Sequence, residues 1–244
     1  MALYDTLGIG YRELRQPDPR IGAYIRQGLG DARSIINVGA GAGSYEPRNC
    51  ELIAVEPSSV MIAQRPQESA PVVRAVAEAL PFADKSFDAA LAILTIHHWP
   101  NINQGLQELA RVASNKVVIF TFDPTVKYAW LIDYFPEFQA IDLAAMPPLT
   151  DIAKQFTRAS IVNVPIPHNC SDGFLCAYWR RPRAYLNADV RAAISSFAKI
   201  ADAKPGLAAL EQDLDSGAWD KRYGELLTQT SLDCGYRLII GDLS

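Results

Sequence analysis

The chain has 244 residues, of which 49% are hydrophobic and 20% are charged, and its formal net charge is -4. This balance is typical of a globular protein and offers no basic surface for nucleic acid or an anionic membrane. Its four cysteines form no C-x-x-C pair, and the first residues carry neither the basic nor the apolar region of a signal peptide. We therefore expect a cytoplasmic protein with reduced thiols, no metal site, and no membrane or nucleic-acid partner.

Short apolar segments in the first half of the chain predict β-strands over residues 34–38, 51–55, 71–75, 87–94 and 116–122. Their nearly continuous apolar character, with little alternation, is typical of parallel strands that are covered on both faces. Between the last two strands, apolar residues recur at helical spacing over residues 101–114, which predicts a helix. Alternation of strands and helices is the pattern of a doubly wound sheet.

The composition changes after Pro124, where aromatic residues begin to cluster. The elements expected beyond it are a helix over residues 147–156, a strand over 160–167, helices over 184–228 and a last strand over 235–241. Thr150 or Asp151 would open the first helix, and Asn187 would cap a later one. The expected fold class is α/β: a Rossmann-like, doubly wound, seven-stranded and mostly parallel sheet with a helical insertion in the C-terminal half.

The stretch SIINVGAGAGSYEP places Gly39, Gly41 and Gly43 at alternate positions directly after the first predicted strand. Glycines in such a turn usually allow a ligand to approach the backbone closely. A dinucleotide needs G-x-G-x-x-G and a following helix, but the third glycine comes one residue early and only residues 44–49 precede the next strand. A P-loop needs G-K-[ST], which does not follow. The dinucleotide is weakened as a ligand but stays open beside a sulfonium cofactor.

More specific are four motifs in order along the chain: INVGAGAGSYE, AVEPSSVMIAQ, AVAEALPFADKSFDAALAILTIHHW and GLQELARV. Together they resemble the motifs of class I S-adenosylmethionine-dependent methyltransferases of the small-molecule type, which include ubiquinone/menaquinone-biosynthesis and natural-product methyltransferases. The resemblance covers about residues 30–123 strongly and the remainder weakly. It implies S-adenosyl-L-methionine as cofactor and a single methyltransferase domain over residues 1–244. That domain would comprise an N-terminal helical lid (1–30), a cofactor-binding half (31–123) and a substrate-side half with a helical cap (124–244).

By position, the resemblance implies how the first two motifs hold the cofactor. Gly39, Gly41 and Gly43 would let the backbone lie against its methionine and ribose portions. Glu56 would accept hydrogen bonds from both ribose hydroxyls. Met61 would pack on the adenine.

Other cofactor contacts are implied outside these two motifs. Ala77 would donate a backbone N–H to the adenine edge, and Leu94 would line the sulfonium. The N-terminal segment with Tyr11 and Arg15 resembles the helix that closes over the cofactor, where Arg15 could pair with the cofactor's carboxylate.

Two positions depart from the pattern of this family. Asn37 stands where an acid is usual, so an amide hydrogen bond would replace a charge interaction with the cofactor's amino group. Val76 stands where many members have an aspartate on the adenine amino group, which leaves backbone contacts and Glu78. Both departures weaken the expected affinity without removing the site.

Candidate acceptor-side residues follow the fourth and fifth predicted strands. His97 and His98 follow the fourth strand, and Asp123 ends the fifth. In similar methyltransferases a histidine and an acid at these strand ends touch the substrate, so these three are the catalytic candidates. Either histidine could act as a base, or one could simply pack against its neighbours, and His168 could enter the same cleft. An aromatic-lined acceptor pocket is a further expectation, from Trp130, Tyr134, Tyr178 and Trp179.

The function expected is methyl transfer from S-adenosyl-L-methionine to the oxygen, nitrogen or carbon of a small-molecule acceptor. A reductase dependent on NAD(P) is the rival enzyme class. A third class, suggested by Asn37 and Val76, is a protein that binds the cofactor without transferring a methyl group. A homodimer is compatible with the sequence.

Overall fold

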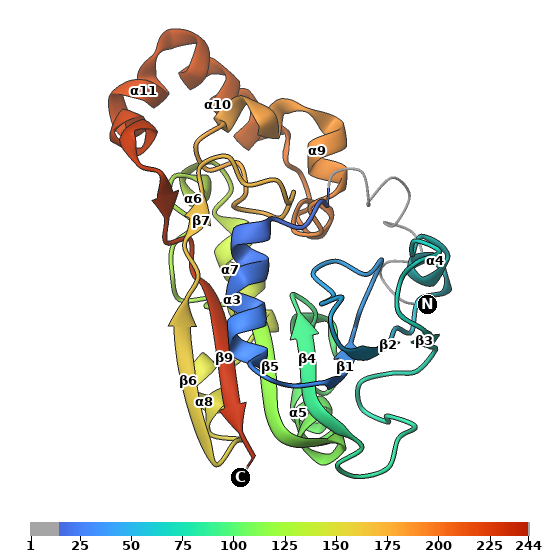
Figure 1. Ribbon diagram of the computed structural model, residues 1–244. Helices are drawn as coiled ribbons and strands as arrows, with labels where there is room; N and C mark the ends of the chain where they lie inside the picture. The colour runs from blue at the N-terminus through green and yellow to red at the C-terminus, as the bar shows by residue number, and fades with distance from the viewer. Residues whose placement is uncertain (1–14, 244) are drawn as a thin grey trace.

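The computed structural model describes residues 15–243. Its main sheet is built from β1 (Ser34–Val38), β2 (Glu51–Val55), β3 (Val72–Val73), β4 (Phe87–Ile93), β5 (Ala113–Phe122), β6 (Arg158–Asn163) and β9 (Tyr236–Asp242). These strands lie in the order β3-β2-β1-β4-β5-β9-β6 (Figure 1). The first five are parallel, and β9 runs antiparallel to both β5 and β6. The expected seven-stranded, mostly parallel sheet is therefore confirmed.

The central strands are buried because their side chains are apolar on both faces. Four of the five β1 side chains are buried, and residues 89–92 of β4 are fully inaccessible. Helix α5 (Ile102–Val112) begins after Asn101, whose side chain accepts a hydrogen bond from Gln104 N over 3.1 Å. It buries Leu106 and Leu109 against β4 and β5. A helix follows β2 and another follows β4, but β1 and β3 each lead to the next strand without one, so the predicted alternation holds only in part.

Helix α3 (Pro19–Leu29) covers the opposite face of the sheet from α5 (Figure 1). Ile21 and Ile25 are buried, and Gly28 allows close packing, since a Cβ there would lie 3.0 Å from Leu238 Cδ2. Residues 19–29 of the proposed lid are therefore a helix packed on β5 and β9. The earlier part of that lid, residues 1–14, lies outside the described residues.

The cap over the carboxyl ends of the parallel strands consists of short helices (Figure 1). They are α6 (Leu131–Tyr134), α7 (Glu137–Ala145), η2 (Pro182–Leu186), α9 (Ala188–Ala192), η3 (Phe197–Lys199), α10 (Lys204–Ser216), α11 (Ala218–Tyr223) and η4 (Gly224–Thr228). Asn187 caps α9 as expected, its Oδ1 accepting from Asp189 N over 2.8 Å. A second sheet pairs β7 (Ile166–Pro167), which follows β6, with β8 (Ser231–Leu232), which follows the last helix of the cap.

The aromatic residues expected to line an acceptor pocket form the core of this cap instead. Trp130 and Trp179 are buried, and Trp130 Nε1 donates to the Trp179 carbonyl oxygen over 2.7 Å. The Trp130 ring also contacts Tyr134, Tyr185 and Trp219 edge to face. These aromatic side chains, which we expected to contact a ligand, thus pack against one another between the cap helices.

One helix start differs from the prediction. Helix α8 (Leu149–Ala153) begins directly after Pro148 and not at Thr150 or Asp151. Pro148 occupies the N-cap position, and because its side chain carries no acceptor, the helix begins without a side-chain cap.

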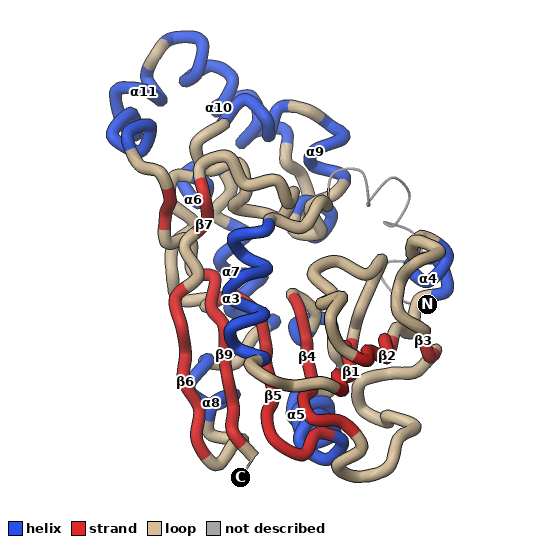
Figure 2. Tube along the Cα trace, viewed as in Figure 1, coloured by secondary structure: helices blue, strands red, loops and turns tan. Residues whose placement is uncertain are grey.

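Loops at the carboxyl ends of the parallel strands gather at one edge of the sheet, below the cap (Figure 2). From β1 the chain proceeds outward to β2 and β3, and then returns to the other side of β1 to form β4. Ligands of open α/β sheets bind at such a reversal of strand order. None of the helices among residues 15–243 is long and apolar enough to span a membrane.

Candidate active site

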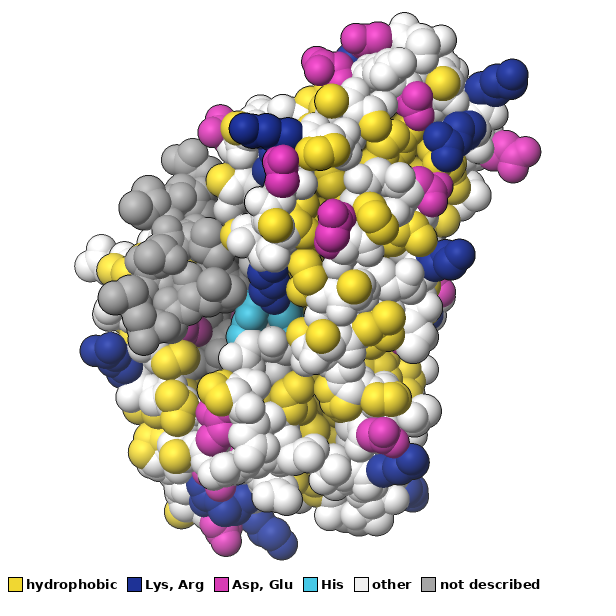
Figure 3. Space-filling view, turned by 180° about the vertical axis from the view of Figure 1, so that it is seen from behind, with side chains coloured by type: hydrophobic (Ala, Val, Ile, Leu, Met, Phe, Trp, Pro, Cys, Tyr) yellow, Lys and Arg dark blue, Asp and Glu magenta, His cyan; other side chains and the backbone are white. Residues whose placement is uncertain are grey.

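A cavity of about 770 Å³ opens at this reversal, between the ends of β1, β2 and β4 and the cap. Most of the predicted site residues line it together: Arg15, Gly39, Gly41, Glu56, Met61, Ala77, Glu78, Leu94, His97 and His98. Figure 3 shows histidine side chains deep in a hollow of the surface, with a basic side chain beside them. Tyr11 lies outside the described residues.

Gly39 and Gly41 shape the turn after β1. Both have positive φ, 71° and 53°, a conformation that costs residues with a Cβ about 1–2 kcal/mol. A Cβ on Gly39 would also lie 2.0 Å from Thr95 Oγ1, so the turn fits tightly against the end of β4. The N–H groups of Gly39 and Ala40 donate to the Val55 carbonyl oxygen over 2.8 and 3.0 Å, which ties the turn to β2.

Gly43 does not line this cavity, unlike the other two glycines. Its N–H donates to the Ala40 carbonyl oxygen over 2.9 Å, and this tight turn directs Gly43 to a second hollow behind the loop. There it lies against the side chains of Arg65 and Glu46. Gly43 therefore closes the turn, and its direct contact with the cofactor stays a prediction.

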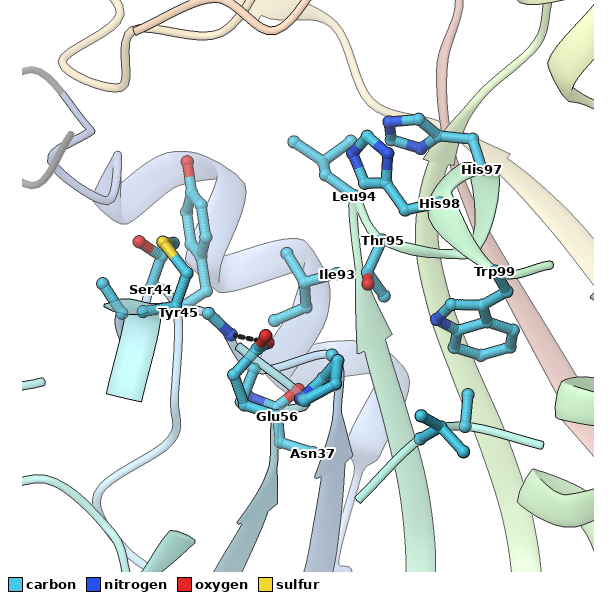
Figure 4. A pocket seen from close by; sticks show the side chains of 18 of the residues that line it. Asn37, Ser44, Tyr45, Glu56, Ile93, Leu94, Thr95, His97, His98 and Trp99 are labelled. Carbon is cyan, nitrogen blue, oxygen red and sulfur yellow. Dashed lines mark hydrogen bonds between the residues drawn. The ribbon is translucent and has the colours of Figure 1, made fainter. Parts of the chain in front are cut away.

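Glu56 lies at the end of β2 on the cavity floor, only 6% exposed. Its Oε2 accepts from Gly41 N over 2.8 Å, a bond drawn in Figure 4, and its Oε1 accepts from Ser58 N over 2.9 Å. Ser58 also caps α4 (Ser59–Ala63), which carries Met61 into the cavity wall. One carboxylate thereby fixes the glycine turn and the start of α4 relative to each other.

Asn37, on β1, lies on the same side of the cavity as Glu56 (Figure 4). Its Nδ2 donates to Glu46 Oε1 over 3.2 Å, which fixes the amide because a carboxylate only accepts. Asn37 Oδ1 is buried and has no hydrogen-bond partner among the described residues. Behind it, Arg65 Nη2 donates to both oxygens of Glu46 over 2.9 Å. The Asn37 carbonyl is thus an oriented acceptor to which no group of residues 15–243 donates.

The wall after β3 carries the positions expected near adenine. Ala77 is buried, and its N–H forms no hydrogen bond with the described residues. Glu78 lines the cavity, but its Oε1 accepts from Asn101 N over 3.1 Å and so belongs to the start of α5. Val76 is 47% exposed, an apolar side chain at the mouth of the cavity.

At the end of β4 the chain turns sharply into η1 (Ile96–His98). Leu94 has a φ of 48°, which is strained for leucine, and its N–H donates to the Phe120 carbonyl oxygen over 2.7 Å. The rings of His97 and His98 lie 3.8 Å apart between centroids (Figure 4), and His97 also contacts Phe122. This turn presents both histidines to the cavity.

Both histidines are neutral at ordinary pH. Burial, reinforced by neighbouring positive charge from Lys199, lowers the pKa of His98 from 6.5 to about 3. Burial, followed by His98, Lys199 and Arg15, lowers the pKa of His97 well below 6.5. A histidine whose pKa is lowered in this way is a weak base, so the site disfavours proton abstraction by either ring.

Arg15 borders the cavity but is already committed to an ion pair. Its Nε donates to Asp172 Oδ1 over 2.5 Å, and the Tyr45 hydroxyl donates to Asp172 Oδ2 over 2.9 Å. Tyr45 comes from the loop after the glycine turn, with a φ of 62°. The pair thus connects the chain before α3, the cap side and the cofactor loop in one network.

Asp123, the third catalytic candidate, does not line the cavity. Its Oδ1 accepts from Thr125 N over 2.9 Å and from Thr125 Oγ1 over 2.7 Å. It therefore stabilises the turn after β5, the usual task of an aspartate at such a position. His168 is also away from the cavity, its N–H bonded to the Thr230 carbonyl oxygen over 2.9 Å.

Sequence reasoning missed some residues of the site. Thr95 lies inside the third of the four family motifs. Its contact with Gly39 could have been suspected, because a glycine at position 39 indicates that a neighbouring segment approaches the backbone closely. Lys199 reaches the cavity from η3 in the cap, and no local pattern marks it. Burial lowers the pKa of this lysine, and Asp142 opposes that change.

The sheet order, with a glycine turn after β1 at the reversal of strand order, is typical of the methyltransferase fold class. The loop between β1 and β2 forms turns and no helix, so a pyrophosphate would lack its usual anchor. Residues 36–121 match the methyltransferase domain family. The chain is also 35% identical, with a TM-score of 0.87, to a methyltransferase from an antibiotic biosynthesis pathway of Anabaena variabilis ATCC 29413, covering 94% of this chain and 99% of that one. The chain belongs to the class I S-adenosylmethionine-dependent methyltransferases.

More distant structures share the fold. A methyltransferase of Thermotoga maritima is 14% identical with a TM-score of 0.54, covering 99% of this chain and 92% of that one. The [4+2]-cyclase SpnF is 13% identical with a TM-score of 0.55, covering 98% and 93%. A comparison with curated proteins found no significant match. The fold thus also occurs in a cyclase, and the acceptor must be argued from this chain's own side chains.

Proposed function

We propose that the protein binds S-adenosyl-L-methionine in the large cavity and transfers its methyl group to a small-molecule acceptor. The observation that carries the proposal is the buried Asn37 carbonyl, which has no donor in the described part of the chain and lies beside the Glu56 carboxylate on one cavity floor. The cofactor has donors for both: an ammonium group for Asn37 and a ribose diol for Glu56. A volume of about 770 Å³ is in the usual range for a ligand of this size.

The surrounding residues fit the rest of the cofactor. Gly39 and Gly41 would let the backbone contact its ribose and methionine portions, and Met61 would pack on the adenine. Ala77 would donate its available N–H to the adenine edge. Leu94 would line the sulfonium, and Arg15 and Tyr11 would lie near the carboxylate as the N-terminal segment closes.

When bound, the cofactor supplies an electrophilic methyl group on a positively charged sulfur. The task left to the chain is to hold the acceptor's nucleophile about 3 Å away and in line with the breaking bond. His97 and His98 are placed for this task at the end of β4, and their neutral state avoids adding positive charge beside the sulfonium. We propose positioning as their role.

Two rival functions make different demands. A reductase would need an anchor for a pyrophosphate, and the turns between β1 and β2 offer no helix N-terminus for one. A protein that only binds the cofactor needs no second binding region, yet the cavity continues toward the cap beyond Leu94 and His97. That continuation favours catalysis.

Methyl transfer can be tested without knowing the acceptor. The wild type and Glu56→Ala are incubated with methyl-labelled S-adenosylmethionine and fractionated small-molecule extracts, and label is followed into products together with S-adenosylhomocysteine. We expect transfer in some fractions with the wild type and a large loss with the variant. S-adenosylhomocysteine binding with no transfer in any fraction would instead support a protein that only binds the cofactor.

We also propose a cytoplasmic location. All four cysteines are free thiols, and Cys170, Cys176 and Cys234 are buried. Thiols are kept in this state in reducing compartments. Fractionation of cells that produce the native protein, with thiol labelling of each fraction, tests this placement.

A further inference from the structure

A smaller cavity of about 50 Å³ adjoins the large one on its cap side. Arg15, Leu94 and His97 line both, so the two meet at the end of β4. We call the smaller cavity the inner chamber; its other lining residues are Phe122, Tyr128, Asp142, Phe174, Leu175, Ile194, Ser195, Ser196 and Tyr236. It has room for only a few atoms, far too few for a nucleoside.

Asp142 is the unexpected member of this mostly apolar lining. It lies on α7 and is 5% exposed. Its Oδ2 accepts a hydrogen bond from the Tyr128 hydroxyl, whereas its Oδ1 accepts none from the described residues. Burial raises the pKa of Asp142, while Tyr128 and Lys199 oppose that change. A carboxylate buried this deeply with one bonded oxygen is costly unless something else satisfies it.

A second polar atom at the chamber also lacks a partner. His97 Nδ1 is buried and has no hydrogen-bond partner among the described residues. Buried polar atoms are nearly always bonded in native proteins. His97 Nδ1 therefore indicates a ligand group in the chamber that it shares with the Asp142 carboxylate. Since His97 also borders the large cavity, this group would lie beside the position of the reacting methyl.

Charges around the chamber favour a neutral group. Arg15 is paired with Asp172 over 2.5 Å. The positive charge of Lys199 balances the negative charge of the Asp142 carboxylate. His97 is neutral. A protonated amine would add an unbalanced positive charge next to the sulfonium. A hydroxyl adds none, and it can donate to Asp142 Oδ1 while also contacting His97 Nδ1.

We propose that the inner chamber binds a hydroxyl group of the acceptor, held by Asp142, with Tyr128 fixing the carboxylate. The acceptor class is thus a neutral alcohol, enol or phenol. This assignment rests on the proposed methyl transfer in one respect: that proposal places the reacting methyl group beside the inner chamber. Asp142 is then the residue that selects a hydroxyl over an ether or an amine.

The test compares small probes that differ only in this group. Phenol and cyclohexanol are titrated against anisole and cyclohexyl methyl ether, with benzylamine as the cationic probe, by ligand-observed NMR on protein saturated with S-adenosylhomocysteine. We expect the wild type to bind each hydroxyl probe about tenfold more tightly than its ether, as for a hydrogen bond to a charged group. Benzylamine should bind no better than the ethers.

Variants locate the preference. Asp142→Leu should abolish it, whereas Tyr128→Phe should keep it, because Oδ1 still accepts. Asp151→Leu, an exposed carboxylate on α8, is the matched control and should behave as wild type. If Asp142→Leu fails to fold, the double variant Tyr128→Phe/Asp142→Leu removes both partners together.

Equal binding of hydroxyls and ethers, no binding of any probe, or preference for benzylamine would each overturn the proposal. So would a hydroxyl preference that survives loss of Asp142. If the wild type does not bind S-adenosylhomocysteine, the proposed function fails, because that complex is formed before any probe is added.

Discussion

The two sides of the active site are built in different ways. On the cofactor side, Gly41 binds Glu56 15 positions away, and Asn37 binds Glu46 nine positions away. On the acceptor side, the inner chamber brings together Leu94, Asp142 and Tyr236, which lie far apart along the chain. The first side depends on short loops that each follow a strand, and the second on how distant segments pack under the cap.

This difference has physical consequences. A site fixed by local turns keeps its shape as long as the backbone conformation of a few residues is kept. A site formed by packing depends on the cap as a whole, and cap contacts can change without altering the sheet. We therefore expect mutations on the cofactor side to act on ligand binding and those on the acceptor side to act on selectivity.

The largest expected effect separates two glycines, one in the turn after β1 and one between α10 and α11 of the cap. Gly39 and Gly217 both have positive φ, so alanine at either should cost about 1–2 kcal/mol of unfolding free energy. Only Gly39→Ala adds a clash with Thr95, which should cost about 1–3 kcal/mol more. Chemical denaturation checks this, and S-adenosylhomocysteine affinity should fall at least about tenfold for Gly39→Ala alone. Equal behaviour of the two variants would contradict the tight fit of the turn.

Glu56→Ala should weaken S-adenosylhomocysteine binding at least about tenfold, because each lost hydrogen bond to the carboxylate contributes roughly 1.5–3 kcal/mol. The fold should survive, although Gly41 and Ser58 lose an acceptor. Calorimetric titration measures the change, with Asp123→Ala as the control that leaves affinity intact. Unchanged affinity in Glu56→Ala would remove the ribose assignment.

Asn37→Ala should produce a smaller loss that depends on the ligand. S-adenosylhomocysteine, which carries the amino group, should bind about tenfold more weakly, whereas methylthioadenosine, which lacks it, should bind as to wild type. Glu46→Gln should give an intermediate loss, since the amide is no longer held by an acceptor-only partner. Equal losses for both ligands would show that Asn37 acts on the fold and not on the amino group.

The smallest effect is a pH dependence. His98 has its pKa lowered to about 3 in the folded chain, so the unfolded chain binds its proton first as pH falls. Its contribution to stability is complete above pH 6.5 and decreases below it, by about 1 kcal/mol between pH 6.5 and 5.5. Denaturation of wild type and His98→Gln at several pH values measures this, and the variant should lose that part of the slope.

The same lowered pKa values predict the activity profile. Once an acceptor is known, the rate of methyl transfer should show no inflection near pH 6.5, because neither histidine titrates there. An inflection that disappears in His97→Ala or His98→Ala would restore a histidine as base.

Sequence reasoning succeeded where structure is local. β1 and β2 begin and end at the predicted residues, since continuous apolar runs between turns leave no alternative. The glycine motif likewise located the cavity. It did not show that Gly43 and Asp123 lie away from the large cavity, because their surroundings depend on the exact path of a turn. Asp142 and Lys199 could not be predicted at all, because only the packing of the cap brings them near His97.

The central claim is that the cavity between β1 and β4 is a preformed site for S-adenosylmethionine. Isothermal titration of the wild type with S-adenosylhomocysteine, and in parallel with NADH and NADPH, tests it most directly. We predict saturable binding of S-adenosylhomocysteine at one site per chain and no measurable binding of either dinucleotide. Absence of S-adenosylhomocysteine binding, or tighter binding of a dinucleotide, would contradict the claim.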